Sequence, residues 1–296
     1  MKRRPLKANA AVGDDIPEAR RYARTMPELP EVETTVRGLA RYLQGERLER
    51  VALYRPDMRF PFPDGFVQRL AGARVTGLGR RAKYGLVHTD RALTMVFHLG
   101  MSGRWRIDPE ALGKHDHLVL ETTGHRFALC DPRRFGFVDL VPTDALEHWP
   151  PFAAMGPEPL SAELTATHLK AAFASRKQAV KLLLLDQRIV AGLGNIYVCE
   201  ALYRSQIDPR KAAGKISKPA LERLVAAIRA VLAEAIEAGG SSLRDYARPD
   251  GQLGYFSKRF DVYDRAGQPC RRQDGGTIAR IVQGGRSTWF CPRCQK

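Results

Sequence analysis

The sequence predicts an α+β multidomain protein in which a β-rich N-terminal lobe precedes a helical C-terminal lobe. Three observations lead to this fold class. Short runs of alternating or β-branched residues, separated by Gly, Pro and Asp, fill residues 48–140. A Pro-rich stretch at 150–159 then marks a linker, and the apolar periodicity beyond it is helical. At 296 residues the chain is long enough for two ordinary domains.

The first elements follow from the order of these patterns. Residues 1–26 are expected to be a disordered extension, or sequence upstream of the true start, because they are polar, basic and aperiodic. A first helix is predicted from Pro30, since Val32, Val36 and Leu39 recur at helical spacing. The many short strands that follow favour a β-sandwich or a barrel. The predicted strands are 51–54, 85–88, 93–98, 117–120, 127–130 and 137–141.

The second half is predicted to be helical up to a final cysteine-bearing segment. The linker is expected around Pro150 and Pro159. A last segment from residue 255 contains aromatic and β-branched residues and three cysteines. The helices predicted between them are 161–173, 179–185, 194–203 and 218–237.

The charge of the chain indicates a polyanionic partner. Forty-eight Lys and Arg against 32 Asp and Glu leave a net charge of +16, with an isoelectric point near 10.0. Without the first 25 residues, 41 basic and 29 acidic side chains remain, so the basic character belongs to the folded part. Nucleic acid is the partner that this excess favours, with an anionic membrane surface or a merely basic protein as alternatives.

The sequence predicts a cytoplasmic protein. No stretch approaches the roughly 20 apolar residues of a membrane span. The first 25 residues contain no apolar stretch of the kind that a secretory signal needs. Five cysteines, an odd number, are then expected to be thiols or metal ligands rather than a disulfide framework.

The C-terminal cysteines predict a zinc site with an unsettled fourth ligand. Cys291 and Cys294, separated by two residues, can present two thiolates to one tetrahedral zinc ion. Cys270 lies upstream, but Gln273 stands where the fourth thiolate is expected, and a neutral amide is a poor zinc ligand. Two alternatives remain: one structural zinc ion, with Asp274 as a candidate fourth ligand, or a hairpin that folds without metal.

Three turns carry residues suited to DNA contact, each with an ordinary structural alternative. Gly192 and Gly194 open a predicted helix, where backbone N–H groups can bind phosphate, although such glycines more often serve tight packing. Arg133 and Phe135 follow a predicted strand and suit a wedge between base pairs, or else a solvated loop. Met101 lies in a Gly-rich turn and suits the space left by a displaced base, although Met is commoner in cores.

A pair of histidines resembles a metal site at first sight. His115 and His117 are separated by one residue, with no third ligand nearby in the sequence. A phosphate contact or structural hydrogen bonds are therefore the preferred interpretation of this pair.

Seven short motifs stand in order along the chain. They are MPELPEVE at 26–33, RAKY at 81–84, HLGMSG at 98–103, HDH at 115–117, DPRRFG at 131–136, GNIY at 194–197 and GYF at 254–256. Each motif alone is weak, but their order and rough spacing over residues 27–296 resemble the bacterial formamidopyrimidine-DNA glycosylase family.

The resemblance implies a fold and an activity. It implies a β-sandwich N-terminal catalytic domain (27–150), a helix-two-turn-helix DNA-binding domain (151–250) and a C-terminal zinc-finger-like β-hairpin (251–296). Duplex DNA would lie between the lobes of a monomer. The implied enzyme is a bifunctional glycosylase and abasic-site (AP) lyase of base excision repair, which excises 8-oxoguanine and formamidopyrimidines in the bacterial cytoplasm, associated with the nucleoid.

The resemblance also implies roles for particular residues. Pro27, as a free N-terminal amine with a pKa of about 8, would attack the damaged nucleotide and form a Schiff base. Glu28 would carry a proton at the sugar, while Lys83 and Arg286 would act as cations beside the leaving phosphates in β- and δ-elimination. The implied DNA contacts are Met101, Arg133 and Phe135 in the space of the displaced base and His115, Lys177 and Asn195 on the backbone.

The N-terminal extension bears directly on this chemistry. If translation began at Met1, the nitrogen of Pro27 would be a tertiary amide that cannot form an iminium. We therefore expect synthesis to start at Met26, or the extension to be cleaved. The alternatives are an endonuclease VIII-like glycosylase for oxidised pyrimidines, or a non-catalytic protein that binds damaged DNA.

Overall fold

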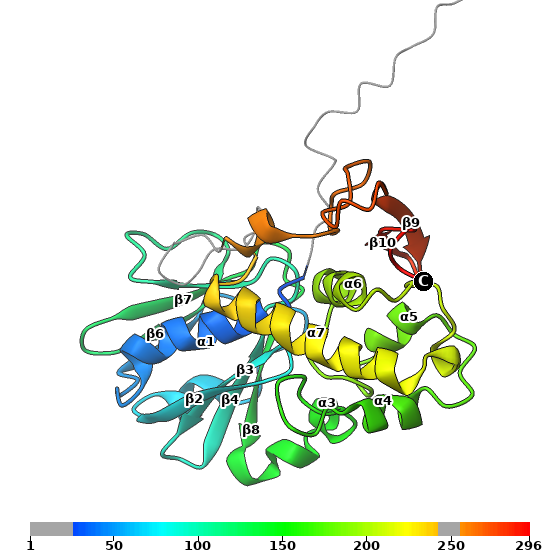
Figure 1. Cartoon of the computed structure of the whole chain (residues 1–296). Helices are drawn as coiled ribbons and strands as arrows, with labels where there is room; N and C mark the ends of the chain where they lie inside the picture. Colours follow the sequence, from blue (N-terminus) through cyan, green and yellow to red (C-terminus); the bar gives the residue numbers. More distant parts are fainter. Residues whose placement is uncertain (1–25, 242–254) are drawn as a thin grey trace, which may run out of the picture.

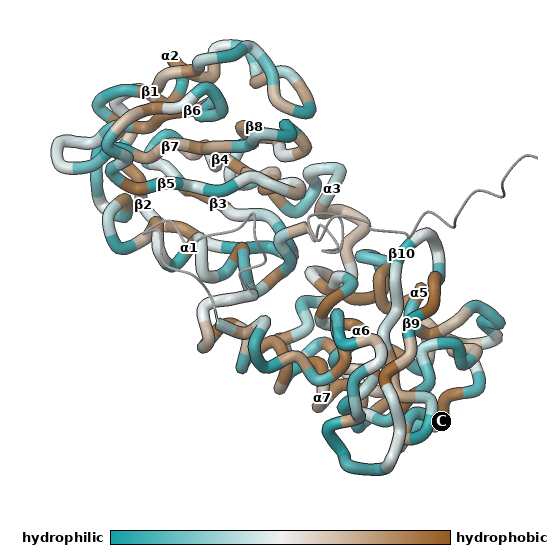
Figure 2. Tube along the Cα trace, turned by 90° about the horizontal axis from the view of Figure 1, so that it is seen from above, coloured by the Kyte–Doolittle hydropathy of each residue, from teal (hydrophilic) through white to brown (hydrophobic). Residues whose placement is uncertain are grey.

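The structure, a computed structural model, describes residues 26–241 and 255–296 and has a β lobe and a helical lobe (Figure 1). The expected extension at 1–25 and the expected domain boundary at residues 250–251 lie outside the described residues. Seen from above, the sandwich and the helices occupy different halves of the molecule, and the C-terminal strands lie with the helices (Figure 2).

The N-terminal lobe is a β-sandwich of two antiparallel sheets. One four-stranded sheet has the order β1-β6-β7-β5 and the other the order β2-β3-β4-β8. The apolar faces of the strands enclose one core. The strands are β1 (Arg50–Leu53), β2 (Val75–Arg81), β3 (Tyr84–Thr89), β4 (Leu93–His98), β5 (Arg104–Ile107), β6 (Asp116–Glu121), β7 (Arg126–Cys130) and β8 (Phe137–Pro142).

The six strands predicted from the sequence are confirmed to within one residue at each end, and two others were missed. β2 contains two glycines and ends in two arginines, so it has few of the β-branched residues that signal a strand. β5 has only four residues, two of them arginine. The short helix α2 (Phe66–Leu70) was also not predicted.

Helix α1 (Leu29–Leu43) belongs to both lobes. Its predicted apolar positions Val32, Val36 and Leu39 are confirmed as part of the sandwich core. Leu29, at its first turn, is instead buried in the core of the helical lobe. The beginning of α1 therefore lies where the two lobes meet.

The region predicted as a linker is partly helical. Pro150 begins the helix α3 (Pro150–Ala153), because proline fits the first turn of a helix. Phe152 of α3 packs with Leu86 and Val96 of the second sheet. The predicted linker around Pro150 and Pro159 therefore begins with a short helix that packs on the sandwich, and the chain leaves the sandwich only after α3.

The helical lobe encloses a second core, to which the C-terminal segment contributes. The helix predicted at 161–173 begins later, at Ala166, because Thr165 caps its first turn through the N–H of His168. The elements are α4 (Ala166–Ala172), α5 (Val180–Leu184), α6 (Asn195–Arg204) and α7 (Lys218–Glu237), with 3-10 helices at Thr143–His148, Ala213–Lys215 and Phe256–Arg259.

The C-terminal segment forms a β-hairpin on the helical lobe. Strands β9 (Ala279–Gln283) and β10 (Arg286–Phe290) pair around a turn made by Gly284 and Gly285. Trp289 and Ile278 are buried in the helical core. Figures 1 and 2 place the hairpin beside α5 and α6.

Candidate active site and metal cluster

Glu28 joins the two lobes through its side chain. Its carboxylate accepts hydrogen bonds from the backbone N–H groups of Ile196, at 2.9 Å, and Tyr197, at 3.5 Å, in the first turn of α6. A Cβ atom at Gly194 would collide with the carboxyl carbon of Glu28, so glycine is required for this close approach. The glycine motif before α6 thus receives a carboxylate of the protein itself at the positive end of the helix.

Glu31 also fixes the start of α1 through hydrogen bonds of its carboxylate. It accepts hydrogen bonds from the Glu28 N–H at 2.9 Å, the Tyr197 hydroxyl at 2.7 Å and the Ser241 hydroxyl at 2.7 Å. Pro27, directly before Glu28, is buried at this point. Sequence reasoning missed Glu31 as a site residue, although its position three residues after Glu28 matches the spacing of a capping box.

The charged groups of the site alter one another's pKa. Burial raises the pKa of Glu28 to about 7, although the nearby Lys83 ammonium opposes this shift. Burial also lowers the pKa of Lys83, which Arg286 lowers further and Glu28 raises. Lys83 therefore lies close enough to both Glu28 and Arg286 for their charges to interact, and Glu28 directly follows Pro27 in the chain.

Lys83 lies in the tight turn between β2 and β3. The preceding residue, Ala82, has a left-handed φ of 51°, and its N–H donates to the carboxylate of Glu158 at 2.5 Å. Arg80 forms ion pairs with Glu158 at 2.8 Å and with Glu33 of α1 at 2.9 Å. These contacts fix the turn that carries Lys83 to both α1 and the segment that connects the lobes.

Arg286 is exposed at the start of β10, and a buried lysine forms hydrogen bonds to the next two residues of this strand. The ammonium of Lys181, which is 0% exposed, donates to the Thr288 hydroxyl at 2.8 Å and to the Ser287 carbonyl at 3.2 Å. The side-chain amide of Asn195 donates to the same carbonyl at 3.0 Å. Sequence reasoning missed Lys181 as a site residue, although a lysine within an apolar helical run was the available signal.

Met101, Arg133 and Phe135 lie on two loops that are tied together. The buried carboxylate of Asp131 accepts a hydrogen bond from Ser102 at 2.5 Å, which joins the loop of Met101 to that of Arg133. The guanidinium of Arg133 lies 4.6 Å from the centre of the Phe135 ring, and Phe135 is 42% exposed. An exposed ring stacked on a cation has the form that a wedge into DNA requires.

The remaining predicted contacts have separate surroundings. A ring nitrogen of His117 lies 2.9 Å from the backbone oxygen of Asp131, so His117 is structural, while His115 is half-buried. Lys177 is exposed in the loop between α4 and α5. Within the described part of the chain, the histidine pair belongs to no group of three metal-ligating side chains.

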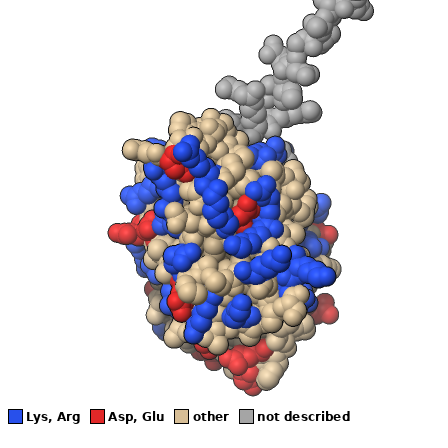
Figure 3. All heavy atoms as spheres, turned by 45° about the vertical axis from the view of Figure 1, so that its right-hand side comes forward, with Lys and Arg blue, Asp and Glu red and all other residues tan. Residues whose placement is uncertain are grey.

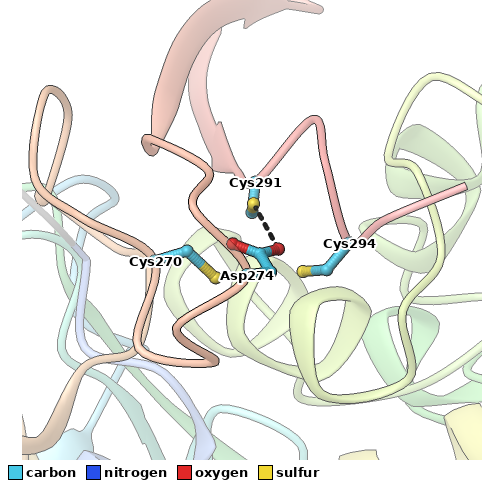
Figure 4. Close-up of side chains that lie close together, drawn as sticks. All are labelled: Cys270, Asp274, Cys291 and Cys294. Atoms are coloured by element: carbon cyan, nitrogen blue, oxygen red, sulfur yellow. Dashed lines mark hydrogen bonds between the residues drawn. The ribbon is translucent and has the colours of Figure 1, made fainter.

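The C-terminal cysteines do form such a group. Cys270, Asp274, Cys291 and Cys294 place one ligand atom each within 4.8 Å of the others. Figure 4 shows the four side chains pointing toward one another. Three sulfur atoms and one carboxylate oxygen are donors that zinc accepts in a tetrahedral site, so these residues fit the predicted ion.

Basic side chains cover much of one face of the molecule. Figure 3 shows many Lys and Arg side chains and few acidic ones on the face that comes forward when the right-hand side of Figure 1 is turned to the viewer. This distribution suits contact with a polyanion. Among the described residues, no helix has the length and apolar character needed to cross a membrane.

Comparison with protein families gives three consecutive matches. Residues 26–138 match the formamidopyrimidine-DNA glycosylase N-terminal domain. Residues 155–247 match the H2TH domain of the same glycosylase, and residues 267–296 match a zinc finger found in FPG and IleRS.

Individual proteins resemble the chain over almost its full length. A formamidopyrimidine-DNA glycosylase of Erythrobacter litoralis is 72% identical over 271 residues, which cover 92% of this chain and 100% of the relative. Its counterpart in Novosphingobium aromaticivorans is 70% identical, with the same coverage.

Solved structures agree with these relatives. A Lactococcus lactis FPG mutant in complex with Fapy-dG DNA is 32% identical, with a TM-score of 0.85 over 91% of this chain and 100% of that one. The MutM (FPG) protein of Thermus thermophilus is 38% identical, with a TM-score of 0.82 over 91% and 98%. The predicted α+β fold is confirmed, and the zinc-finger match with the side-chain cluster confirms one structural zinc ion.

Proposed function

This chain belongs to the formamidopyrimidine-DNA glycosylase family, and on that premise we propose that it excises oxidised purines from duplex DNA and then nicks the strand through a Schiff base on Pro27. The observation that carries the proposal is the closeness of Lys83 to both Glu28 and Arg286, with Pro27 directly before Glu28 at the junction of the lobes. A nucleophile, a proton carrier and two cations are what the two reactions need.

The first reaction removes the base. The nitrogen of Pro27 attacks C1′ of the damaged nucleotide, the C1′–O4′ bond breaks, and O4′ takes the electron pair of that bond and the proton of Glu28. The base then leaves C1′ with the electron pair of its bond and the proton of the amine, and an iminium forms between C1′ and the nitrogen. A carboxyl group with a pKa of about 7 is protonated in a large fraction of molecules at neutral pH, which suits this role.

The second reaction cuts the strand. The iminium draws electrons from the C2′–H bond, so water takes the C2′ proton and the phosphate at C3′ leaves with the electron pair of the C3′–O bond. In a second elimination water takes the C4′ proton and the phosphate at C5′ leaves with the electron pair of the C5′–O bond. Water then hydrolyses the iminium and frees Pro27. Lys83 and Arg286 are proposed to stand beside the leaving phosphates, where a cation stabilises the developing charge.

Recognition of the lesion is assigned to the loops that carry Met101, Arg133 and Phe135. The damaged base must leave the duplex stack, at a cost of a few kcal/mol. We assign the emptied space to Met101, Arg133 and Phe135, with Arg133 facing the orphaned cytosine. His115, Lys177 and Asn195 are assigned to backbone phosphates, which fix the register without reading sequence.

Related structures support duplex DNA as the partner. One Lactococcus lactis FPG structure contains Fapy-dG DNA and another contains DNA with an abasic site. We place DNA between the lobes of a monomer, with domains at 27–150, 151–250 and 251–296. An enzyme with this substrate acts at the bacterial nucleoid, so a cytoplasmic location stays a prediction of the proposed function.

The proposed mechanism requires a free Pro27 nitrogen. The family match begins at Met26, and the whole length of the Erythrobacter relative aligns with 92% of this chain. Both observations favour a mature protein that begins at Pro27, after initiation at Met26 and removal of that methionine.

Borohydride trapping on a duplex with 8-oxoguanine opposite cytosine tests the mechanism. Protein expressed from Met26 is compared with protein expressed from Met1, and each N-terminus is checked by intact mass. We expect a trapped covalent complex only when Pro27 is the terminus. A verified Pro27 terminus without a trapped complex would refute the Schiff base and favour a protein that only binds damaged DNA.

A panel of lesions separates the purine from the pyrimidine substrate. One Lactococcus lactis FPG structure contains an oxidised pyrimidine, so thymine glycol is included with 8-oxoguanine and formamidopyrimidine. We expect faster excision of both purine lesions. Faster excision of thymine glycol would favour the endonuclease VIII-like alternative.

A further inference from the structure

The zinc cluster departs from the four-thiolate pattern of many zinc fingers. Two residues separate Cys291 from Cys294, but three separate Cys270 from Asp274. We propose that Asp274, and not Gln273, is the fourth ligand, so that three thiolates and one carboxylate hold the ion (Figure 4).

The spacing of the donor atoms fits a shared tetrahedral ion. The sulfur of Cys291 lies 3.4 Å from Oδ2 of Asp274. A tetrahedral zinc ion with bonds of about 2.3 Å to sulfur and about 2.0 Å to oxygen separates these ligands by about 3.5 Å. Cys270 and Cys294 place their sulfur atoms in the same group, within 4.8 Å.

A backbone hydrogen bond orients the carboxylate of Asp274. Its Oδ1 accepts the N–H of Gly276 at 2.8 Å, so Oδ2 faces the cysteines. Outer hydrogen bonds of this kind are what fix carboxylate ligands in metal sites. Asp274 is half-buried, as a ligand of an ion held beneath the hairpin should be.

Gln273 does not share this environment. It is exposed, and its left-handed φ of 55° takes up the extra residue of the loop. Its N–H donates to the carbonyl of Cys270 at 3.1 Å, which closes the turn and turns the next residue inward. The longer loop therefore delivers Asp274 to the position where the shorter spacing would deliver a residue at 273.

A carboxylate in place of a fourth thiolate preserves the charge of the site and changes the chemistry of one ligand. A carboxylate carries the same charge as a thiolate, so the charge that surrounds the ion is that of four cysteines. Oxygen is a harder donor than sulfur, and zinc accepts both. The cluster also contains one fewer sulfur atom that oxidation can convert to a non-ligating form.

Zinc X-ray absorption on the purified full-length protein tests the ligand set directly. We expect three sulfur neighbours at about 2.3 Å and one oxygen at about 2.0 Å. Four sulfur neighbours, or two, would overturn the proposal. Because this readout does not involve DNA, its failure is distinguishable from a failure of the proposed enzymatic function.

Variants identify the residue that supplies the oxygen. Asp274→Ala should lower the zinc retained after dialysis against a chelator, whereas the matched control Gln273→Ala should retain as much as the unaltered protein. In cobalt-substituted protein, Asp274→Cys should raise the sulfur charge-transfer absorption by about one third, because a fourth thiolate is added. Zinc loss in Gln273→Ala with none in Asp274→Ala, or no increase in Asp274→Cys, would contradict the assignment even if Asp274→Ala folds poorly.

Discussion

Glu28 has two tasks that its surroundings serve together. Its carboxylate caps α6 through the N–H groups of Ile196 and Tyr197, which tie it to the helical lobe. The burial that this position requires raises its pKa to about 7, into the range where a group can give and take protons at neutral pH. One side chain therefore joins the lobes and, in the proposed mechanism, carries the proton.

Base excision should follow a bell-shaped dependence on pH. Excision needs a protonated Glu28, whose pKa is raised to about 7, so the rate should fall about tenfold per pH unit well above neutrality. It also needs an unprotonated Pro27 amine, with an ordinary pKa of about 8, so the rate should rise with pH on the acid side. Single-turnover excision of 8-oxoguanine between pH 5.5 and 9.5 measures both limbs, and a rate that rises steadily to pH 9.5 would contradict the role of Glu28.

Glu28→Gln is the matched variant for this profile. Loss of the proton carrier should slow base excision by about 10²- to 10⁴-fold and abolish the falling limb. Nicking of a preformed abasic site should suffer less, because that sugar already reaches an open aldehyde form without a leaving base. Equal losses on both substrates would point to a structural defect.

Phe135 should contribute to lesion extrusion and little to stability. Its ring is 42% exposed and packs on the guanidinium of Arg133, so its removal leaves no cavity in a core. Phe135→Ala should lower the excision rate about tenfold, as a share of the few kcal/mol that base extrusion costs. The free energy of unfolding, measured by thermal denaturation, should stay within about 0.5 kcal/mol of that of the unaltered protein. Fluorescence of 2-aminopurine opposite or beside the lesion reports the extrusion, and an unchanged signal would remove the wedge assignment.

Among the structural elements, the turn between β2 and β3 depends on a residue distant in sequence. Glu158 accepts the N–H of Ala82 and pairs with Arg80, next to Lys83. Glu158→Ala should slow nicking of abasic DNA about tenfold, because an unpaired N–H of the buried Ala82 costs about 1–3 kcal/mol and frees the turn. Glu158→Gln, whose amide oxygen still accepts the N–H, should recover part of the rate. Equal rates in all three proteins would show that the turn holds Lys83 without Glu158.

The elements that sequence reasoning found and missed have a common physical explanation. Helix α7 (Lys218–Glu237) was predicted to the residue, since its apolar face recurs over five turns and Gly239 and Gly240 follow it. β2 escaped prediction because it is stabilised by pairing with β3 and not by the propensity of its own residues. Local sequence signals report the preferences of individual residues, and pairing with a neighbouring strand overrides them.

The same distinction applies to the site. Pro27, Glu28 and Lys83 were assigned through short, continuous motifs, and Arg286 through the family resemblance. Their supporting residues, such as Glu158 and Lys181, act on backbone groups of other segments. Such contacts leave no pattern at a fixed spacing, so only the folded chain reveals them. For Asp274 the sequence offered a candidate, and the spatial cluster with three cysteines distinguishes it from Gln273.

For the complete chain, the net charge of +16 makes DNA affinity depend on salt. Each phosphate contact by a cation contributes about 0.9 to the slope of log affinity against log salt. Lys177→Ala should lower that slope by about this amount, equally for damaged and undamaged duplexes, since Lys177 is exposed and assigned to the backbone. Fluorescence anisotropy at several salt concentrations measures the slope, and an unchanged slope would show that Lys177 contacts no phosphate.

The sharing of α1 between two cores governs how the protein melts. Leu29 is buried with the helices, while Val32 and Val36 are buried with the sandwich. Neither lobe can unfold without removing residues of this helix from the core of the other lobe. We therefore expect one cooperative calorimetric transition, with equal calorimetric and van't Hoff enthalpies. Two separate transitions would contradict this. With a single transition, heated protein contains only folded and fully unfolded molecules, and no half-folded species in which Pro27 is separated from the helical lobe.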